Sequence, residues 1–256
     1  MSVLSVKGLS KEFGGVVAVA DLTFVIEAGR IHSIIGPNGA GKTTLFNLIT
    51  GLYAPTAGRI EFAGEDVTAL PPAGRAQLGI ARTFQNLQIF FNMTALENVM
   101  AGRHLHVDAR LLPSLLHLPS VVRANRAARA AARELMVSVG LEAYLDADAD
   151  AMPYGALKRL EIARALATEP KILLLDEPAA GLNPKETSEI DALIQRIAAF
   201  GTTVVLVEHD MKLVMGVSDH ILVLDHGRRL AEGTASEVRV HPAVIRAYLG
   251  AGAQTG

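Results

Sequence analysis

Short apolar runs alternate along this chain with segments whose apolar residues recur at helical spacing. Three of these runs, at residues 30–35, 171–176 and 202–207, are mainly apolar and end in glycine-rich or polar stretches. A shorter run at residues 221–224 has the same character. Strands without polar alternation are typical of a parallel sheet that is covered on both faces. The pattern therefore predicts an α/β fold with a buried sheet at its centre.

Other elements are expected around this centre. Short apolar or β-branched runs between turn residues predict further strands at residues 2–6, 22–27, 59–62 and 80–85. Apolar positions at helical spacing, in part opened by proline, predict helices at residues 44–49, 71–79, 184–200 and 244–249. Residues 94–166 are rich in Ala, Leu and Arg and poor in strand signals, and residues 123–140 form an amphipathic helical pattern with a solvated arginine face. We expect residues 86–165 to form an inserted, mostly helical subdomain.

A glycine-rich stretch lies between the apolar run at residues 30–35 and the expected helix at 44–49. Residues 36–43 read GPNGAGKT and match the pattern G-x-x-x-x-G-K-[ST] at every fixed position. The order strand, loop, helix distinguishes a phosphate-binding loop from a tight turn that carries a solvated lysine. In such a loop the backbone N–H groups and the helix N-terminus surround phosphate oxygens. The expected ligand residues are Gly36, Pro37, Asn38, Gly39, Ala40, Gly41, Lys42, Thr43 and the following Thr44.

The loop predicts a nucleoside triphosphate and Mg²⁺ as ligands. Lys42 supplies a charge for the β- and γ-phosphates, and the Thr43 hydroxyl is a ligand for Mg²⁺. Asp176 and Glu177 end a second apolar run, where an aspartate holds Mg²⁺ and a glutamate orients or deprotonates the attacking water. An ordinary acidic strand end, stopped by Pro178, is the alternative, and the phosphate loop disfavours it.

Three more side chains are candidates on local evidence. His209 follows the run at 202–207, and Gln85 ends the expected strand at 80–85, so both lie where α/β sheets bind ligands. His209 is placed to hydrogen-bond a γ-phosphate, and Gln85 to reach the metal or the water. Phe13, beside Gly14-Gly15, has an aromatic face that stacks on a base. A helix-cap neighbour, a polar strand end and a core aromatic are the respective alternatives.

Composition narrows the class of protein. The 256 residues carry a net charge of −2, which gives no electrostatic reason to expect nucleic acid as a partner. The chain has no cysteine, so disulfides and thiolate metal sites are excluded. The N-terminus lacks the apolar core of a signal peptide, and no uncharged apolar run reaches 18 residues. We therefore expect a soluble chain.

The order of these residues resembles that of ABC-transporter ATP-binding subunits, over essentially the whole chain. Phe13, the loop 36–43, Gln85, Tyr154-Gly155, Asp176-Glu177 and His209 occur in the order of that family. Four longer stretches sharpen the resemblance to the branch that serves importers of branched-chain amino acids and related small amides. They are RLEIARAL (159–166), DEPAAGLNP (176–184), VEHDMKLVMG (207–216) and HPAVIRAYLG (241–250).

The resemblance implies a P-loop ATPase core with an antiparallel β subdomain and an inserted helical subdomain. The core would comprise residues 1–85 and 166–233, the helical subdomain residues 86–165, and a helical tail residues 234–256. Phe13 would stack on adenine, Gln85 would sense the metal, Asp176 would hold Mg²⁺, and Glu177 and His209 would act in hydrolysis. Residues 181–183 would cross the interface of a head-to-tail dimer, in which Tyr154 and Gly155 contact the partner's ATP.

The chain departs from the family at one loop. The family's signature loop reads Leu-Ser-Gly-Gly-Gln, whereas residues 152–156 here are Met-Pro-Tyr-Gly-Ala. Pro153 lacks the hydroxyl that would donate to the partner's γ-phosphate, and Ala156 lacks the glutamine amide. A hydrogen bond to a charged group contributes about 1.5–3 kcal/mol, so we predict weaker ATP-driven dimer closure than in a chain with serine at this position.

The implied partners are permease transmembrane subunits, an identical or paralogous ATPase subunit and, indirectly, a solute-binding protein. The resemblance favours a paralogue and implies a peripheral position on the cytoplasmic face of the plasma membrane. The apolar stretches 87–91 and 111–118 are expected to form the docking surface for the permease unless they pack internally. A soluble ATPase of the same superfamily that acts in DNA repair or translation, and a regulatory module that holds ATP with weak turnover, are the alternatives.

Overall fold

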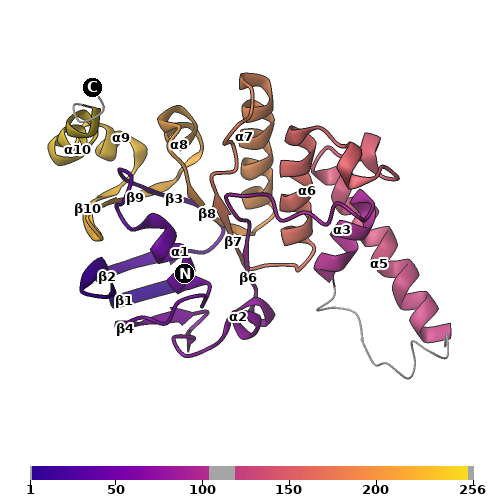
Figure 1. Cartoon of the computed structure of the whole chain (residues 1–256), viewed down its shortest axis with the longest axis horizontal. Coiled ribbons are helices and arrows are strands. Elements are labelled where there is room, and N and C mark those ends of the chain that lie inside the picture. The colour runs from indigo at the N-terminus through magenta and orange to yellow at the C-terminus, as the bar shows by residue number, and fades with distance from the viewer. Residues whose placement is uncertain (1, 104–118, 253–256) are drawn as a thin grey trace.

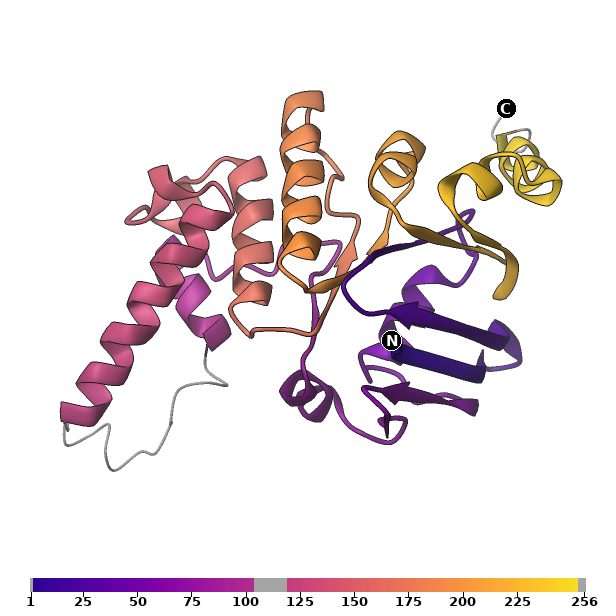
Figure 2. The same cartoon turned by 180° about the vertical axis from the view of Figure 1, so that it is seen from behind.

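The structure, a computed structural model, describes residues 2–103 and 119–252. Two β-sheets lie side by side with helix α1 (Lys42–Ile49) between them. Helices α3 (Ala95–Gly102), α5 (Pro119–Ser138) and α6 (Tyr154–Leu166) gather at one end of the molecule, beyond strands β6 and β7, as Figures 1 and 2 show from opposite sides. The C-terminal helices lie at the other end.

The larger sheet has six strands in the order β10-β9-β3-β8-β7-β6. Its members are β3 (Ile31–Ile35), β6 (Ile80–Arg82), β7 (Ile172–Asp176), β8 (Thr203–Val207), β9 (His220–Asp225) and β10 (Arg228–Gly233). All neighbouring pairs are parallel except β9 and β10, which are antiparallel. This arrangement confirms the parallel sheet that the apolar runs predict.

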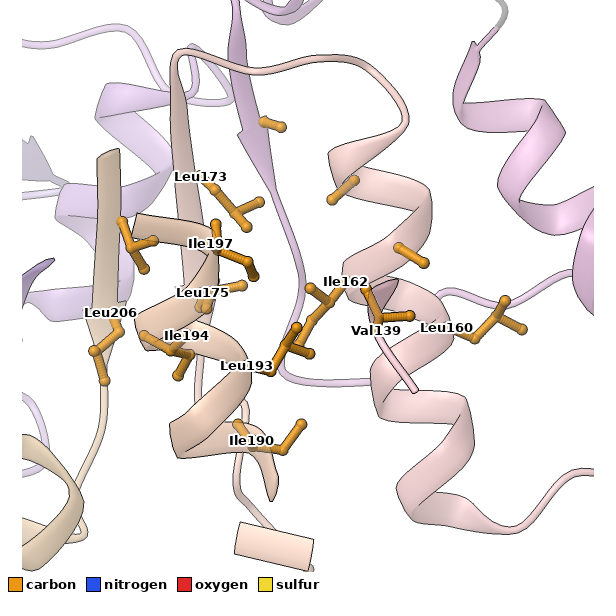
Figure 3. Packing of buried hydrophobic residues seen from close by; sticks show 14 of the residues in the cluster. Val139, Leu160, Ile162, Leu173, Leu175, Ile190, Leu193, Ile194, Ile197 and Leu206 are labelled. Atoms are coloured by element: carbon orange, nitrogen blue, oxygen red, sulfur yellow. The ribbon is translucent and has the colours of Figure 1, made fainter. Parts of the chain in front are cut away.

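Both faces of this sheet are buried, which explains why its strands lack polar alternation. Leu173 and Leu175 of β7 pack toward helix α7 (Pro184–Ala199), whose Ile194 and Ile197 face them (Figure 3). Leu174, which points to the opposite face, belongs to the second core cluster with the side chains of α1. The period-2 geometry of a strand thus divides one apolar run between two cores.

The smaller sheet is antiparallel, with the order β2-β1-β4-β5. Its strands are β1 (Ser2–Phe13), β2 (Val16–Glu27), β4 (Ala57–Phe62) and β5 (Glu65–Asp66). Strands β1 and β2 are about twice as long as the runs 2–6 and 22–27 predict. The pairing of β1 with β2 shifts register between Val6 and Leu9, and such an irregularity interrupts the alternation on which a sequence-based prediction depends.

The remaining described α-helices are short. They are α2 (Pro72–Leu78), α8 (Met211–Val217), α9 (Ala235–Arg239) and α10 (Pro242–Gly252). Strand β10 and helices α8 and α9 were not expected from the sequence. Helix α9 has only five residues and is fixed by a capping box between Thr234 and Glu237. None of the described helices is long and apolar enough to cross a membrane.

One expected strand is shorter than predicted. Strand β6 ends at Arg82, not at residue 85, so Gln85 lies in the loop that follows and the prediction of a strand over 80–85 was wrong at its end. Thr83 still donates its N–H to Leu174 O, and beyond it the backbone turns toward helix α6. The predicted apolar stretch 111–118 lies outside the described residues.

Candidate nucleotide-binding and hydrolysis site

The parallel strands bring the predicted site residues to one edge of the larger sheet. Strands β3, β8, β7 and β6 are neighbours that run in the same direction, so their carboxyl ends lie together. The phosphate loop follows β3, and the loop with Gln85 follows β6. Asp176 ends β7, Glu177 comes directly after it, and His209 follows β8. This edge is where ligands bind in open α/β sheets.

The phosphate loop has the backbone conformation that its glycines allow. Gly39 and Gly41 have φ of +80° and +97°, a region that other residues rarely adopt. A Cβ on Gly41 would lie 2.5 Å from Ala18 O, so the loop packs directly on strand β2. Helix α1 starts at Lys42, and its first N–H groups therefore point toward the loop.

Lys42 is buried within this loop. Its Nζ donates to Gly36 O at 2.7 Å and to Pro37 O at 3.0 Å. Burial lowers the pKa of Lys42, and the charges of Glu177 and Asp176 raise it. The charges of Asp176 and Glu177 therefore act on the lysine of the phosphate loop, although Asp176 comes 134 positions after Lys42 in the sequence.

Asp176 is the buried carboxylate at the end of β7. Its Oδ2 accepts from Arg82 Nη2 at 2.8 Å, and Arg82 Nη1 also donates to Asn47 Oδ1 at 2.5 Å. Arg82 was not identified from the sequence, because nothing local distinguishes an arginine at a strand end from a solvated one. The carboxylate of Asp176 and the hydroxyl of Thr43 provide the oxygen donors that Mg²⁺ prefers.

The side chain of Glu177 contacts two other predicted residues, Gln85 and His209. Its Oε2 lies 2.9 Å from His209 Nε2 and accepts from Gln85 Nε2 at 3.1 Å. The side chain of Glu177 is 13% exposed, whereas that of His209 is 54% exposed, so His209 covers the carboxylate from the solvent side. Glu177 has φ of +50°, a strained conformation for a residue with a side chain, and its N–H donates to Val207 O. The backbone thus directs this carboxylate toward the sheet edge.

Glu208 is a buried acid that the sequence reasoning missed. Its Oε1 accepts from the Ala179 N–H at 2.9 Å and its Oε2 from the His209 N–H at 3.0 Å. Burial raises the pKa of Glu208, and these backbone donors lower it. Glu208 therefore joins the turn after Glu177 to the backbone of His209. An acidic residue directly after an apolar strand was the available signal.

Residues 152–156 include the first turn of helix α6, which begins at Tyr154. Pro153 is the N-cap of this helix and provides no side-chain cap. The ring of Tyr154 is half exposed and lies against Gly181, where an added Cβ would be 3.2 Å from Cε1 of the ring. Tyr154 and residues 181–183, which the resemblance places at a dimer interface, are therefore adjacent on one surface.

Phe13 is the last residue of β1 and pairs with Val16 of β2. Its ring meets that of Tyr53 edge to face at 5.2 Å, and Lys11 Nζ lies 4.8 Å from its centroid. Phe13 and Tyr53 are both more than a third exposed. Phe13 is thus an accessible aromatic face and not the core residue of the alternative interpretation.

A largely apolar groove of about 590 Å³ lies between α2, β6, α3 and α6. It is bordered by the loop that carries Gln85. Of the predicted stretch 87–91, Ile89 is buried, whereas Phe90 and Phe91 are each about half exposed. Its lining includes Leu52, Ala76, Phe84, Leu87, Phe90, Glu161 and Arg164.

The fold and this site together define a nucleotide-binding cassette, and comparison with known proteins agrees. Residues 19–180 match the model of the ABC transporter family, so the chain belongs to the ATP-binding subunits of ABC transporters and is an ATPase. Residues 228–254 match the model named branched-chain amino acid ATP-binding cassette transporter.

Relatives with curated names cover nearly the whole chain. The high-affinity branched-chain amino acid transport ATP-binding protein BraF of Pseudomonas aeruginosa is 47% identical over 97% of this chain and 98% of its own length. The high-affinity branched-chain amino acid transport ATP-binding protein LivG of Escherichia coli K12 is 47% identical over 96% of this chain and 97% of its own length.

Solved structures agree on the fold. A nucleotide-free ATP-binding cassette from an ABC transporter has a TM-score of 0.84 and 32% identity, covering 97% of this chain and 99% of its own. The ADP conformation of MJ1267, also an ATP-binding cassette of an ABC transporter, has a TM-score of 0.83 and 32% identity over 98% and 99%. The P-loop ATPase core that the resemblance implies is confirmed.

Proposed function

We propose that this chain hydrolyses ATP to drive the uptake of branched-chain amino acids or related small amides through a membrane permease. The proposed site of hydrolysis is supported by the contact of Gln85 and His209 with one oxygen of Glu177. The observation that carries the substrate class is similarity to BraF and LivG along nearly the whole chain.

Each predicted residue has a proposed role at this edge. Glu177 orients and deprotonates the attacking water, with His209 and Gln85 holding the carboxylate in place. Lys42 and the N–H groups of residues 39–44 bind the phosphates, and Phe13 stacks on adenine. Thr43, Asp176 and Gln85 would hold Mg²⁺, which neutralises phosphate charge when it is bound.

Two copies of the cassette fold are proposed to meet head to tail. Tyr154 and Gly155 of one subunit would contact the ATP held by the other, and residues 181–183 would line the interface. The adjacency of Tyr154 and Gly181 supports this arrangement. The second subunit is an identical chain or, as we favour, a paralogue. Closure on ATP and reopening after hydrolysis would move the permease, because ATP binds the two states differently.

The groove between α2, β6, α3 and α6 is the proposed docking surface for the permease at the cytoplasmic face of the plasma membrane. Phe90, which lines the groove, and the next residue, Phe91, expose apolar surface, which suits a partner interface. We also propose that the chain is divided into a nucleotide-binding core over 1–85 and 166–233, a helical subdomain over 86–165 and a helical tail over 234–256. A solute-binding protein would deliver the substrate from the other side of the membrane.

The first test measures ATP turnover of the purified chain beside Glu177→Gln, together with dimer formation on ATP. Turnover in the parent, with loss of turnover and an accumulating ATP-bound dimer in the variant, is expected. Equal turnover in both would contradict the role of Glu177. If the parent alone is inactive, adding the paralogous subunit separates obligate pairing from a regulatory module with a weak signature loop.

A further inference from the structure

Helix α6 contacts the loop that carries Gln85 through two buried charged side chains. Lys158 and Glu161 are each 3% exposed and lie one turn apart on the same helix. Neither was singled out from the sequence, and neither belongs to the phosphate loop or to the carboxylates at the end of β7. Burying two charged side chains is costly unless both have polar partners. Their partners therefore show what the two residues do.

Glu161 holds the backbone on both sides of Gln85. Its Oε1 accepts from the Phe84 N–H at 3.4 Å and from the Gln88 N–H at 3.3 Å. Burial raises the pKa of Glu161, whereas these two backbone donors and the charges of Lys158 and Arg164 lower it. One carboxylate oxygen thus binds both ends of the five-residue segment 84–88, whose second residue is Gln85.

Lys158 contacts the same segment from a different direction. Its Nζ lies 3.5 Å from Gln85 O and 3.4 Å from Glu177 O. The ammonium therefore bridges the main chains of the two residues whose side chains meet at 3.1 Å. Helix α6 thus binds the Phe84 N–H before Gln85, the carbonyl of Gln85 itself and the Gln88 N–H after it, so the position of the Gln85 side-chain amide depends on this helix.

We propose that Glu161 is a positioning residue, which places Gln85 against Glu177 by binding the Phe84 and Gln88 N–H groups to helix α6. Because α6 begins at Tyr154, the contact also ties the loop at 152–156 to the hydrolytic carboxylate of the same subunit. Glu161 also lines the docking groove, so the same side chain lies between that surface and Gln85. The inference rests on the proposed roles of Gln85 and Glu177.

A matched pair of substitutions tests this role. Glu161→Gln retains Oε1 as an acceptor for both N–H groups, whereas Glu161→Met has similar size and no oxygen. We expect Glu161→Met to lower kcat for ATP by at least about tenfold, since small misplacement of a catalytic group has effects of this order. The KM for ATP should stay within about twofold, because the phosphate loop is untouched. Glu161→Gln should restore most of kcat.

Amide hydrogen exchange gives a second readout, which distinguishes a local change at the loop from a loss of overall stability. The amides of Phe84 and Gln88 should exchange faster in Glu161→Met and at the parental rate in Glu161→Gln. Leu160→Met, a buried neighbour in α6 without a polar contact, is the control and should leave kcat and exchange unchanged. The proposal is overturned if Glu161→Met leaves kcat or the amide exchange rates unchanged. It is also overturned if Glu161→Met and Glu161→Gln lower kcat equally. Turnover that survives in Glu177→Gln contradicts the proposed function instead.

Discussion

Arg82 on β6 donates to Asp176 at the end of β7 across 2.8 Å, and both side chains are almost wholly shielded from solvent. The pair joins the edge strand of the larger sheet to the carboxylate proposed to hold Mg²⁺. Arg82 also lies 5.4 Å from the ring of Phe46 in α1 and 5.0 Å from that of Phe84. One arginine therefore connects the strand, the helix after the phosphate loop and the loop with Gln85.

Removing Arg82 is expected to destabilise the fold. Arg82→Met leaves a buried carboxylate without its partner, which costs about 3 kcal/mol of unfolding free energy. Lys7→Met, at the exposed pair with Glu61, is the control and should cost less than about 1 kcal/mol. Urea unfolding of both variants checks the comparison. Similar losses of unfolding free energy in the two variants would show that the buried pair stabilises the fold no more than the exposed pair does.

Two glycines of the phosphate loop should differ in their tolerance of alanine. Both have positive φ, but an added Cβ meets Ala18 O at 2.5 Å at Gly41 and nothing within 4 Å at Gly39. Gly39→Ala should cost about 1–2 kcal/mol from backbone strain alone, and Gly41→Ala more, because the loop must move away from β2. Thermal unfolding measures the difference. Equal losses would contradict the close approach of the loop to β2.

Pro153→Ser should strengthen ATP-driven dimerisation. Serine at the N-cap of α6 supplies a hydroxyl for the partner's γ-phosphate, worth about 1.5–3 kcal/mol, or roughly 10- to 100-fold in the dimer dissociation constant. Pro153→Ala, which lacks the hydroxyl, is the control. Sedimentation with ATP and Glu177→Gln in the background checks the prediction. Unchanged dimerisation in the serine variant would refute it.

The buried His32 should make stability depend on pH. Burial, together with the charge of nearby His220, lowers its pKa from 6.5 to about 4. The unfolded chain therefore binds a proton that the folded chain does not, so stability is full above pH 6.5 and falls as the pH drops toward 4, by up to roughly 3 kcal/mol. His32→Gln should flatten this fall, and exposed His226→Asn should not. Urea midpoints between pH 7 and 4.5 test it.

Local sequence was sufficient for the elements whose chemistry lies within one stretch. The buried strands β3, β7 and β8, the phosphate loop at 36–43 and the acids at 176–177 were all predicted, because each is a contiguous pattern. The bounds of β1 and β2 were not, since a register shift near Gly8 breaks the alternation. The predicted end of β6 was also wrong. The Phe84 N–H, just beyond Thr83, donates to the carboxylate of Glu161 in α6, which is 77 positions further along the sequence.

The sequence by itself determined the class of fold, the phosphate loop and the candidate residues Gln85, Asp176, Glu177 and His209. Only the tertiary structure decided which of them touch. Gln85 and His209 share one oxygen of Glu177 because three parallel strands end at the same edge. The buried partners Arg82, Lys158, Glu161 and Glu208 acquire their roles through contacts across the sheet and helices. Their charges are stable in the interior only because the fold places a distant polar group beside each one, and no local pattern encodes that pairing.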